Sequence, residues 1–145
     1  MKVNIRKIFK KDKNIVINMM EEFYSSPAVS TNGSKEIFNA NVNACIKKSP
    51  YLEGFVFETE GKVIGYGMVA KSYSTEFGKP CFWIEDLYLL ENYRGKKIGE
   101  QFFNFVFDRY KNGIFRLEVE KENENAVKLY ERCGFNYLPY LEMKK

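Results

Sequence analysis

The stretch that most constrains this chain runs from Trp83 to Phe103, where an apolar run gives way to a basic turn and then to an amphipathic pattern. This is the order of a strand, a loop and a helix. A helix that begins after such a loop points unpaired backbone N–H groups toward it, and these groups bind anions. The sequence Arg94-Gly95-Lys96-Lys97 adds positive charge at this point. The stretch therefore predicts a strand–loop–helix unit that binds an anion such as a phosphate.

The length and composition predict one domain over residues 1–145. Hydrophobic residues make up 45% of the chain and aromatic residues 17%, which is enough for a packed core. No apolar run approaches the roughly 20 residues of a membrane span, so no membrane partner is expected. The first residues, Met-Lys-Val-Asn, lack the apolar core of a secretion signal. We therefore expect a cytoplasmic protein.

The reactive side chains exclude several kinds of site. The chain has no histidine, so proton transfer falls to Glu, Asp, Tyr, Lys or Cys. Cys45, Cys81 and Cys133 are widely spaced and share no metal-ligand pattern, which predicts reduced thiols and no metal site. A net charge of +4 fits solvated surface lysines better than a nucleic-acid-binding patch, and it also suits a small polyanionic ligand.

Hydrophobic periodicity and turn residues divide the chain into strands and helices. The predicted order is a strand at residues 3–8, helices at 12–24 and 34–48, strands at 55–59, 63–70 and 81–90, a helix at 95–110, a strand at 114–119, a helix at 123–133 and an extended strand at 135–143. Strands 55–59 and 63–70 form a hairpin, and helices connect the later strands. The pattern predicts an α/β fold with a mixed sheet that is antiparallel at its beginning.

Two details of this pattern concern packing. In the first helix Ile15, Met19 and Phe23 recur at four-residue intervals and are predicted to face the core. In the second strand of the hairpin, Gly65 and Gly67 fall on one face and offer no side chain to pack. A bulky group is therefore expected to lie across that face.

The chain also carries the parts of a known arrangement. Arg94, Ile98 and Gly99 are spaced like a pyrophosphate-binding motif, although Lys97 stands where that motif has its first glycine. Downstream, the pattern Asn123-x-x-Ala126-x-x-x-Tyr130-x-x-x-Gly134-Phe135 follows. Together these features resemble the GCN5-related N-acetyltransferase (GNAT) superfamily. Within it, the run Ile84-Glu85-Asp86-Leu87-Tyr88 is similar to the diamine and polyamine acetyltransferase branch. The resemblance covers essentially the whole chain and implies a mostly antiparallel sheet with splayed central strands.

The resemblance implies that acetyl-coenzyme A (acetyl-CoA) is the co-substrate. The backbone of Leu87, Tyr88 and Leu89 would pair with the pantetheine arm like an added strand. The pyrophosphate would lie on the loop and helix start formed by Arg94, Gly95, Lys96, Lys97, Ile98, Gly99 and Glu100. Asn123, which is also a candidate helix cap, and Tyr130 would lie near the pantetheine arm and the sulfur. A bulge near Asp86 or Leu87 would free the strand edge.

The same resemblance assigns catalytic roles. An amine must be uncharged to attack a thioester, so a base has to accept its proton. Glu85 is the first candidate, and Glu118 on the neighbouring strand is the alternative; either carboxylate could also be a plain outward-facing strand residue. Tyr130 would protonate the departing thiolate, because the pKa of a tyrosine, about 10, exceeds that of a thiol, about 8.5. A core tyrosine that only hydrogen-bonds the sulfur is the alternative role.

We therefore expect an N-acetyltransferase that uses a ternary complex and acts on a small primary amine. The carboxylates of Glu85 and Asp86 near the mouth, with Glu21 and Glu22 on the first helix, favour a cationic acceptor such as a polyamine. A protein N-terminus or lysine as the acceptor, and a non-catalytic acyl-CoA-binding module, are the alternatives. The resemblance leaves a homodimer open, and the residues do not identify the acceptor.

Overall fold

The structure is a computed structural model that describes residues 1–145. Its strands are β1 (Asn4–Lys7), β2 (Leu52–Thr59), β3 (Lys62–Ser74), β4 (Lys79–Leu89) and β5 (Ile114–Leu117). Its α-helices are α1 (Lys13–Tyr24), α2 (Lys35–Ile46), α3 (Ile98–Arg109) and α4 (Glu124–Arg132), and short 3₁₀ helices span Lys10–Asp12 and Glu91–Tyr93. No helix has the length and apolar character needed to cross a membrane.

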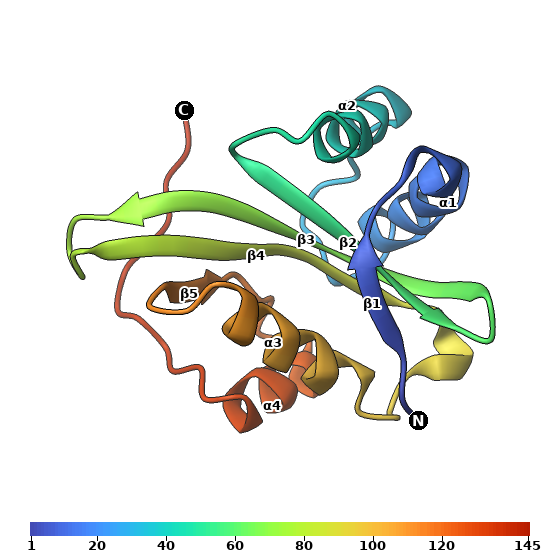
Figure 1. The fold of residues 1–145 in the computed structure, drawn as a ribbon. Helices are drawn as coiled ribbons and strands as arrows, with labels where there is room; N and C mark the ends of the chain where they lie inside the picture. Colours follow the sequence, from blue (N-terminus) through green and yellow to red (C-terminus); the bar gives the residue numbers. More distant parts are fainter.

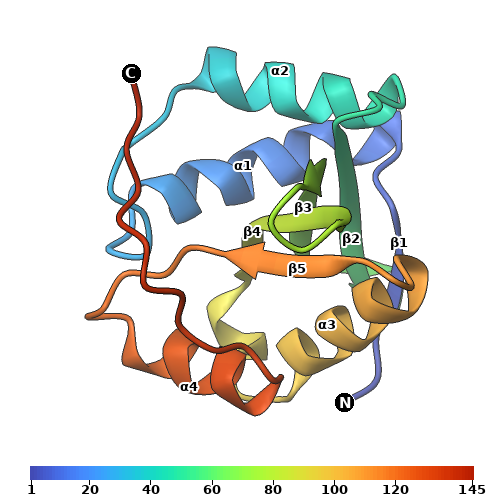
Figure 2. The same ribbon diagram turned by 90° about the vertical axis from the view of Figure 1, so that its left-hand side faces the viewer.

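The strands form one five-stranded sheet in the order β1-β2-β3-β4-β5. The pairs from β1 to β4 are antiparallel, and β4 pairs with β5 in parallel. Helices α1 and α2 cover one face of the sheet, and α3 and α4 lie on the other (Figure 1). The view from the side shows the same three layers, with the sheet between the two helical pairs (Figure 2). The predicted mixed α/β fold is confirmed.

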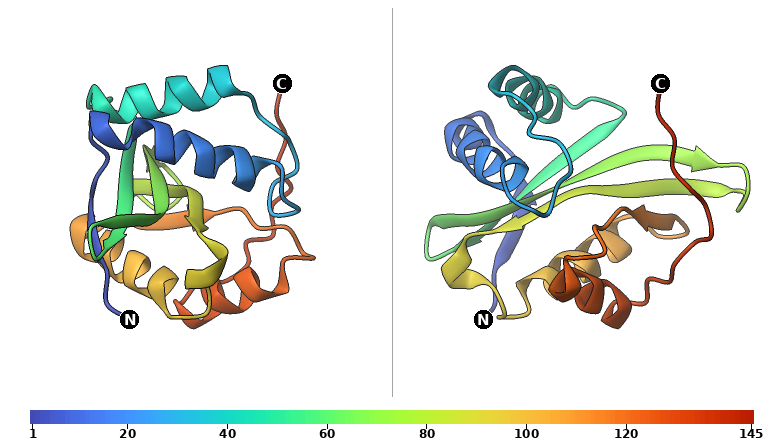
Figure 3. Two further views of the ribbon diagram at one scale, coloured as in Figure 1. Left: turned by 90° about the vertical axis from the view of Figure 1, so that its right-hand side faces the viewer. Right: turned by 180° about the vertical axis from the view of Figure 1, so that it is seen from behind.

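One predicted element is absent. Residues 135–143, expected as a last strand, have no regular secondary structure and pair with no strand. The segment climbs from α4 past β5 toward the side of the sheet that carries α1 and α2 (Figure 3). Its apolar side chains Leu141 and Met143 are each 96% exposed, so burial does not hold it against an edge of the sheet. The other predicted elements are present, with ends that differ by a few residues.

Each face of the sheet has its own hydrophobic core. Met20, Phe38 and Tyr66 belong to the core beneath α1 and α2. Phe57 and Phe102 belong to the core beneath α3 and α4. The central strands therefore bury side chains on both faces, which accounts for the nearly continuous apolar runs in their sequences.

Of the two packing predictions, the one for the glycines of β3 is confirmed at Gly67 and the one for α1 is partly wrong. Gly67 is confirmed as a point of close approach, since a Cβ added there would lie 2.5 Å from the Phe102 ring. The predicted core stripe of α1 is partly wrong, because Ile15 is 37% exposed. Val16 and Met20, each one position after a residue of the predicted stripe, are fully buried. Helix α1 is therefore rotated on the sheet relative to the prediction.

The predicted splay of the central strands is confirmed. Strand β5 pairs only with the first part of β4, from Cys81 to Ile84, and the rest of β4 has no strand on that edge. A bulge accompanies the separation: Val69 of β3 lies opposite Ile84, but Met68 lies opposite Asp86. Glu85 is the extra residue, one position before the predicted bulge. Beyond it, β4 runs free on one edge toward its end at Leu89.

Candidate active site

The gap between β4 and β5 opens into the main pocket, which has a volume of about 1430 Å³. Its walls come from the free part of β4, the start of α3, the segment between β5 and α4, and the loop after α1. This volume exceeds the roughly 300–1,000 Å³ of an ordinary small-molecule pocket. The pocket is therefore large enough for an extended ligand that reaches from the α3 start to β4.

Strand β4 gives this pocket a backbone wall. Leu87 and Leu89 contribute side chains to the core beneath α3, while Tyr88 is buried on the opposite face. Because no strand pairs with this edge, its outward backbone N–H and C=O groups are free for a ligand, except the Leu89 carbonyl, which accepts a hydrogen bond from Arg94. An extended, amide-containing chain can pair with such an edge as an additional strand.

The start of α3 forms the second wall. The first helical hydrogen bond runs from the Gln101 N–H to the Lys97 carbonyl (3.2 Å), so the amides of Ile98, Gly99 and Glu100 have no helical partner. The helix begins at Ile98 and not at the predicted Gly95, because Gly95 and Lys97 have positive φ values of 72° and 62°. Arg94 donates from Nε to the Leu89 carbonyl (2.9 Å), which ties the loop to the end of β4.

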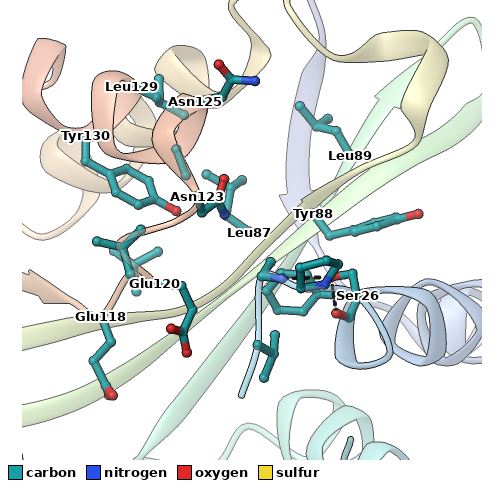
Figure 4. A pocket seen from close by; sticks show the side chains of 18 of the residues that line it. Ser26, Leu87, Tyr88, Leu89, Glu118, Glu120, Asn123, Asn125, Leu129 and Tyr130 are labelled. Carbon is teal, nitrogen blue, oxygen red and sulfur yellow. Dashed lines mark hydrogen bonds between the residues drawn. The ribbon is translucent and has the colours of Figure 1, made fainter. Parts of the chain in front are cut away.

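Carboxylates gather at the other end of the pocket. Glu85 reaches the pocket from the bulge, and partial burial together with the charges of Asp86 and Glu142 raises its pKa. Glu118 follows β5, and a hydrogen bond with Glu142 raises its pKa to about 7, with smaller contributions from burial and Glu85. Glu118 and Glu120 point away from Tyr130 in the close view of the pocket (Figure 4). This end of the pocket attracts cations, and the pKa of about 7 lets Glu118 accept a proton near neutral pH.

Tyr130 lines the same pocket from α4. Its ring packs edge-on against Phe103 and Phe135, and its hydroxyl points into the space beside Leu87 and Asn123 (Figure 4). Burial, with a smaller effect of Cys133, raises the pKa of Tyr130 to about 12. The hydroxyl therefore stays protonated at neutral pH and can donate to an anion in the pocket.

Asn123 does not act as the predicted helix cap. It precedes α4, but its side chain makes no capping hydrogen bond. Its φ of −83° and ψ of 66° differ from the extended backbone typical of a capping residue. Its side chain lies beside Leu87 in the pocket wall (Figure 4), where the amide is free to bind a ligand.

Comparison with known proteins identifies the family. A model of the acetyltransferase (GNAT) family matches residues 16–135. The chain belongs to this family.

Curated GNAT relatives match about half of the chain. A thialysine N-epsilon-acetyltransferase from Mus musculus is 37% identical over 81 residues, which are 53% of this chain and 47% of the relative. A glucosamine 6-phosphate N-acetyltransferase from Arabidopsis thaliana is 33% identical over 82 residues, or 54% of each chain. A spermine/spermidine N(1)-acetyltransferase from Bacillus subtilis (strain 168) is 25% identical over 84 residues, or 54% of this chain and 55% of the relative. The matched region thus spans about half the length of these relatives.

Solved structures match the whole chain in fold. A protein from Clostridium difficile 630 described as a possible acetyltransferase has a TM-score of 0.81 at 22% identity, covering 100% of this chain and 97% of its own. AAC(6')-Iy, solved with a bisubstrate analogue of coenzyme A, has a TM-score of 0.80 at 14% identity, covering 100% and 98%. At these identities the likeness is one of fold.

The structure brings nearly all the predicted site residues to one pocket. Lining it are Glu85, Leu87, Tyr88, Leu89, Arg94, Gly95, Lys97, Ile98, Gly99, Glu100, Glu118, Asn123 and Tyr130. Lys96 is the exception, since it is exposed and does not line the pocket. Asp86 also departs from the expectation of a carboxylate near the mouth, because it is only 2% exposed and lies inside the protein.

Sequence reasoning singled out no individual residue in two further parts of the pocket wall. The loop from Ser26 to Thr31 lines the pocket, as does Glu142 from the C-terminal segment. Neither belongs to a recognisable motif. Lys128 and Arg132 of α4 also lie in the wall, and their i, i+4 spacing on a helix that follows the motif residue Asn123 could have indicated them.

Lys97 occupies a backbone conformation that favours glycine. A side chain in this left-handed region costs roughly 1–2 kcal/mol, so Lys97→Gly is expected to raise the free energy of unfolding by about 1 kcal/mol, as measured by urea denaturation. Lys96→Gly is the matched control, because Lys96 has no positive φ and gains nothing from glycine. An unchanged or lower stability of Lys97→Gly would show that the loop bears no strain at this residue.

Proposed function

We propose that this GNAT protein transfers the acetyl group of acetyl-CoA to a small primary amine by direct attack in a ternary complex. The observation that carries the proposal is the separation of β4 from β5 beyond Ile84. It leaves a free backbone edge that leads from the open amides of the α3 start to the carboxylate end of the pocket. A thioester on a long amide-containing arm needs these features in this order.

The pocket residues suit acetyl-CoA. The unpartnered amides at the α3 start, with Arg94 and Lys97 beside them, offer a site for a pyrophosphate. The free edge of β4 at Leu87 to Leu89 offers partners for the amides of the pantetheine arm. Coenzyme A would supply the activated acetyl group, and the chain's own residues would hold the thioester between Glu85 and Tyr130.

The chemistry assigned to the chain is proton transfer. The amine nitrogen attacks the carbonyl carbon of the thioester, a C–N bond forms and the C–S bond breaks. Glu85 accepts the proton that the amine gives up, directly or through water, with Glu118 as the alternative base. The sulfur leaves with the electron pair of the C–S bond and takes a proton from the Tyr130 hydroxyl.

The finer proposal is that the acceptor is a cationic amine such as a diamine or polyamine. Besides Glu100 at the start of α3, five carboxylates contribute to the pocket wall: Glu85, Glu118, Glu120, Glu122 and Glu142. They attract a second ammonium group and repel a phosphate on the acceptor. Two of the curated relatives, the thialysine and the spermine/spermidine acetyltransferases, carry acceptor names of this cationic kind.

Thiol release from acetyl-CoA with a panel of amines tests the proposal. We expect spermidine and thialysine to give a kcat/KM at least about 10-fold higher than glucosamine 6-phosphate, because of the carboxylate wall. Peptides with a free N-terminus or a lysine test the protein-acceptor alternative. Acetyl-CoA binding without turnover of any amine or peptide would contradict the proposal and favour a binding module.

A further inference from the structure

The end of α1 is fastened to β4 by two tyrosine–carboxylate hydrogen bonds that run in opposite directions. Tyr24, the last residue of α1, donates its hydroxyl to Oδ1 of Asp86 (2.8 Å). In return, Tyr88 of β4 donates its hydroxyl to Oε2 of Glu22 on α1. We call these two hydrogen bonds the latch. Each element supplies one donor and one acceptor, so the latch fixes both the distance and the register between α1 and β4.

Asp86 is an unusual residue to bury. It is 2% exposed, and burial raises its pKa while the hydroxyls of Tyr66 and Tyr24 oppose that shift. Tyr66 donates to its second oxygen, Oδ2 (2.7 Å). An apolar side chain of the same size would fill this space at a lower desolvation cost. Asp86 is therefore better explained by the geometry that its directional hydrogen bonds impose than by stability.

Both ends of the latch adjoin the candidate active site. On β4, Asp86 directly follows Glu85, the extra residue of the bulge, so a fixed Asp86 side chain fixes the bulge. On α1, Tyr24 itself lines the pocket, and it lies just before the loop whose residues Ser26 to Thr31 also line it. The latch thus joins the strand that carries the proposed base to the wall on the α1 side of the pocket.

We infer that Tyr24 and Asp86 are positioning residues that set the amine-binding side of the pocket by holding the loop 26–31 at a fixed distance from Glu85. The inference rests on the proposed acetyl transfer and adds to it which contacts determine the amine site. The α3 start takes no part in the latch, and its loop touches the latch only where Arg94 lies over the Tyr88 ring (5.5 Å). Loss of the Tyr24–Asp86 hydrogen bond, which leaves Tyr88 in place, therefore affects the amine site and spares the acetyl-CoA site.

Two tyrosines on the same carboxylate provide a matched test. Tyr24→Phe and Tyr66→Phe each remove one hydroxyl from Asp86, but only Tyr24 comes from α1, since Tyr66 lies in β3. We expect Tyr24→Phe to raise the KM for the amine by about 5- to 10-fold and to speed hydrogen exchange at the amides of residues 26–31. The KM for acetyl-CoA should stay within about twofold. Tyr66→Phe should leave both KM values and the exchange of the loop within about twofold of wild type.

A second pair of variants guards against a failure of Tyr24→Phe to fold. Glu22→Ala breaks the other half of the latch at an exposed position. Glu21→Ala is the control, because Glu21, contrary to the expectation from the sequence, does not line the pocket and pairs only with Lys35 (3.6 Å). We expect Glu22→Ala to change the amine KM and the loop exchange in the same direction as Tyr24→Phe. Glu21→Ala should leave both nearly unchanged.

The outcomes separate this inference from the proposed function. Equal effects of Tyr24→Phe and Tyr66→Phe would overturn the inference and indicate a merely structural hydrogen-bond network. Equal effects of Glu22→Ala and Glu21→Ala would also overturn it and indicate a general charge effect. If the wild-type protein acetylates no amine, the proposed function fails. Loop exchange then still decides the latch, because faster exchange in Tyr24→Phe alone supports it and unchanged exchange rejects it.

Discussion

Replacing Glu85 by Gln is expected to lower kcat by about 100-fold or more while acetyl-CoA still binds, because the amide has the shape of the carboxyl group but cannot accept the proton of the amine. Glu85 is the extra residue of the β4 bulge and lines the pocket, so its carboxyl group is accessible to a bound amine. Steady-state kinetics with the amine found in the panel, and a binding titration with acetyl-CoA, provide the two measurements.

The pH dependence gives this prediction a second readout. A base must be ionised to act, and burial with the charges of Asp86 and Glu142 raises the pKa of Glu85. Activity should therefore fall as the pH is lowered through that raised pKa, at a pH above the ordinary range of a glutamate. Glu142→Gln removes one of the charges that raise the pKa, so its acidic limb should move to lower pH.

Glu118→Gln is the matched control for Glu85→Gln. It removes the other candidate base at the same end of the pocket, and we expect kcat to fall by less than about 10-fold. The opposite ranking of the two variants would assign the base to Glu118, whose pKa of about 7 also suits a proton acceptor. Unchanged activity and an unchanged pH profile in Glu85→Gln would exclude Glu85 as the base.

Local sequence signals were sufficient for most of the fold. Periodicity and turns indicated every α-helix and each of the paired strands, because each element buries a face that its own sequence displays. Gly65 and Gly67 on one face of β3 indicated that a bulky group lies across it, and the structure identifies the Phe102 ring at Gly67. The splayed strands followed from the family resemblance, since no local pattern indicates where two parallel strands separate.

The errors arose where distant contacts decide the structure. Residues 135–143 were predicted to be extended as a last strand but find no strand to pair with. Ile15 fits the helical stripe of α1, yet the rotation of that helix on the sheet leaves it partly exposed. Asp86 was predicted to lie near the mouth of the site, but its two tyrosine partners come from α1 and β3 and hold it inside the protein. None of these contacts is encoded within the segment concerned.

The candidate site divides in the same way. The side proposed to bind acetyl-CoA consists of short motifs around Arg94 and Asn123 that the sequence displays. The amine side depends on the loop from Ser26 to Thr31 and on Glu142, which only the folded chain brings to the pocket. The roles assigned to Glu85, Glu118 and Tyr130 remain predictions, and their geometry makes them separable by experiment.

Tyr130→Phe is expected to lower kcat by about 10- to 100-fold and to change the KM for acetyl-CoA by less than about threefold. The substitution removes the hydroxyl that points into the pocket but keeps the ring that packs on Phe103 and Phe135. Loss of a positioned proton donor affects the transition state, in which the sulfur develops charge, more than it affects binding. Tyr137→Phe, at a residue that is 75% exposed and outside this pocket, provides the matched control.

The raised pKa of Tyr130 fixes what its pH profile should show. An acid must be protonated to act, and burial raises the pKa of this tyrosine to about 12, so wild-type activity should show no alkaline loss from this group below about pH 10. An acetyl thioester whose thiol has a lower pKa releases its thiolate more readily without a proton donor. Such a thioester should restore much of the rate lost in Tyr130→Phe. If kcat is unchanged and only the KM for acetyl-CoA rises, the hydroxyl binds the sulfur and does not protonate it. Rescue by the better leaving group, combined with an unchanged KM, would leave proton donation as the role that accounts for both results.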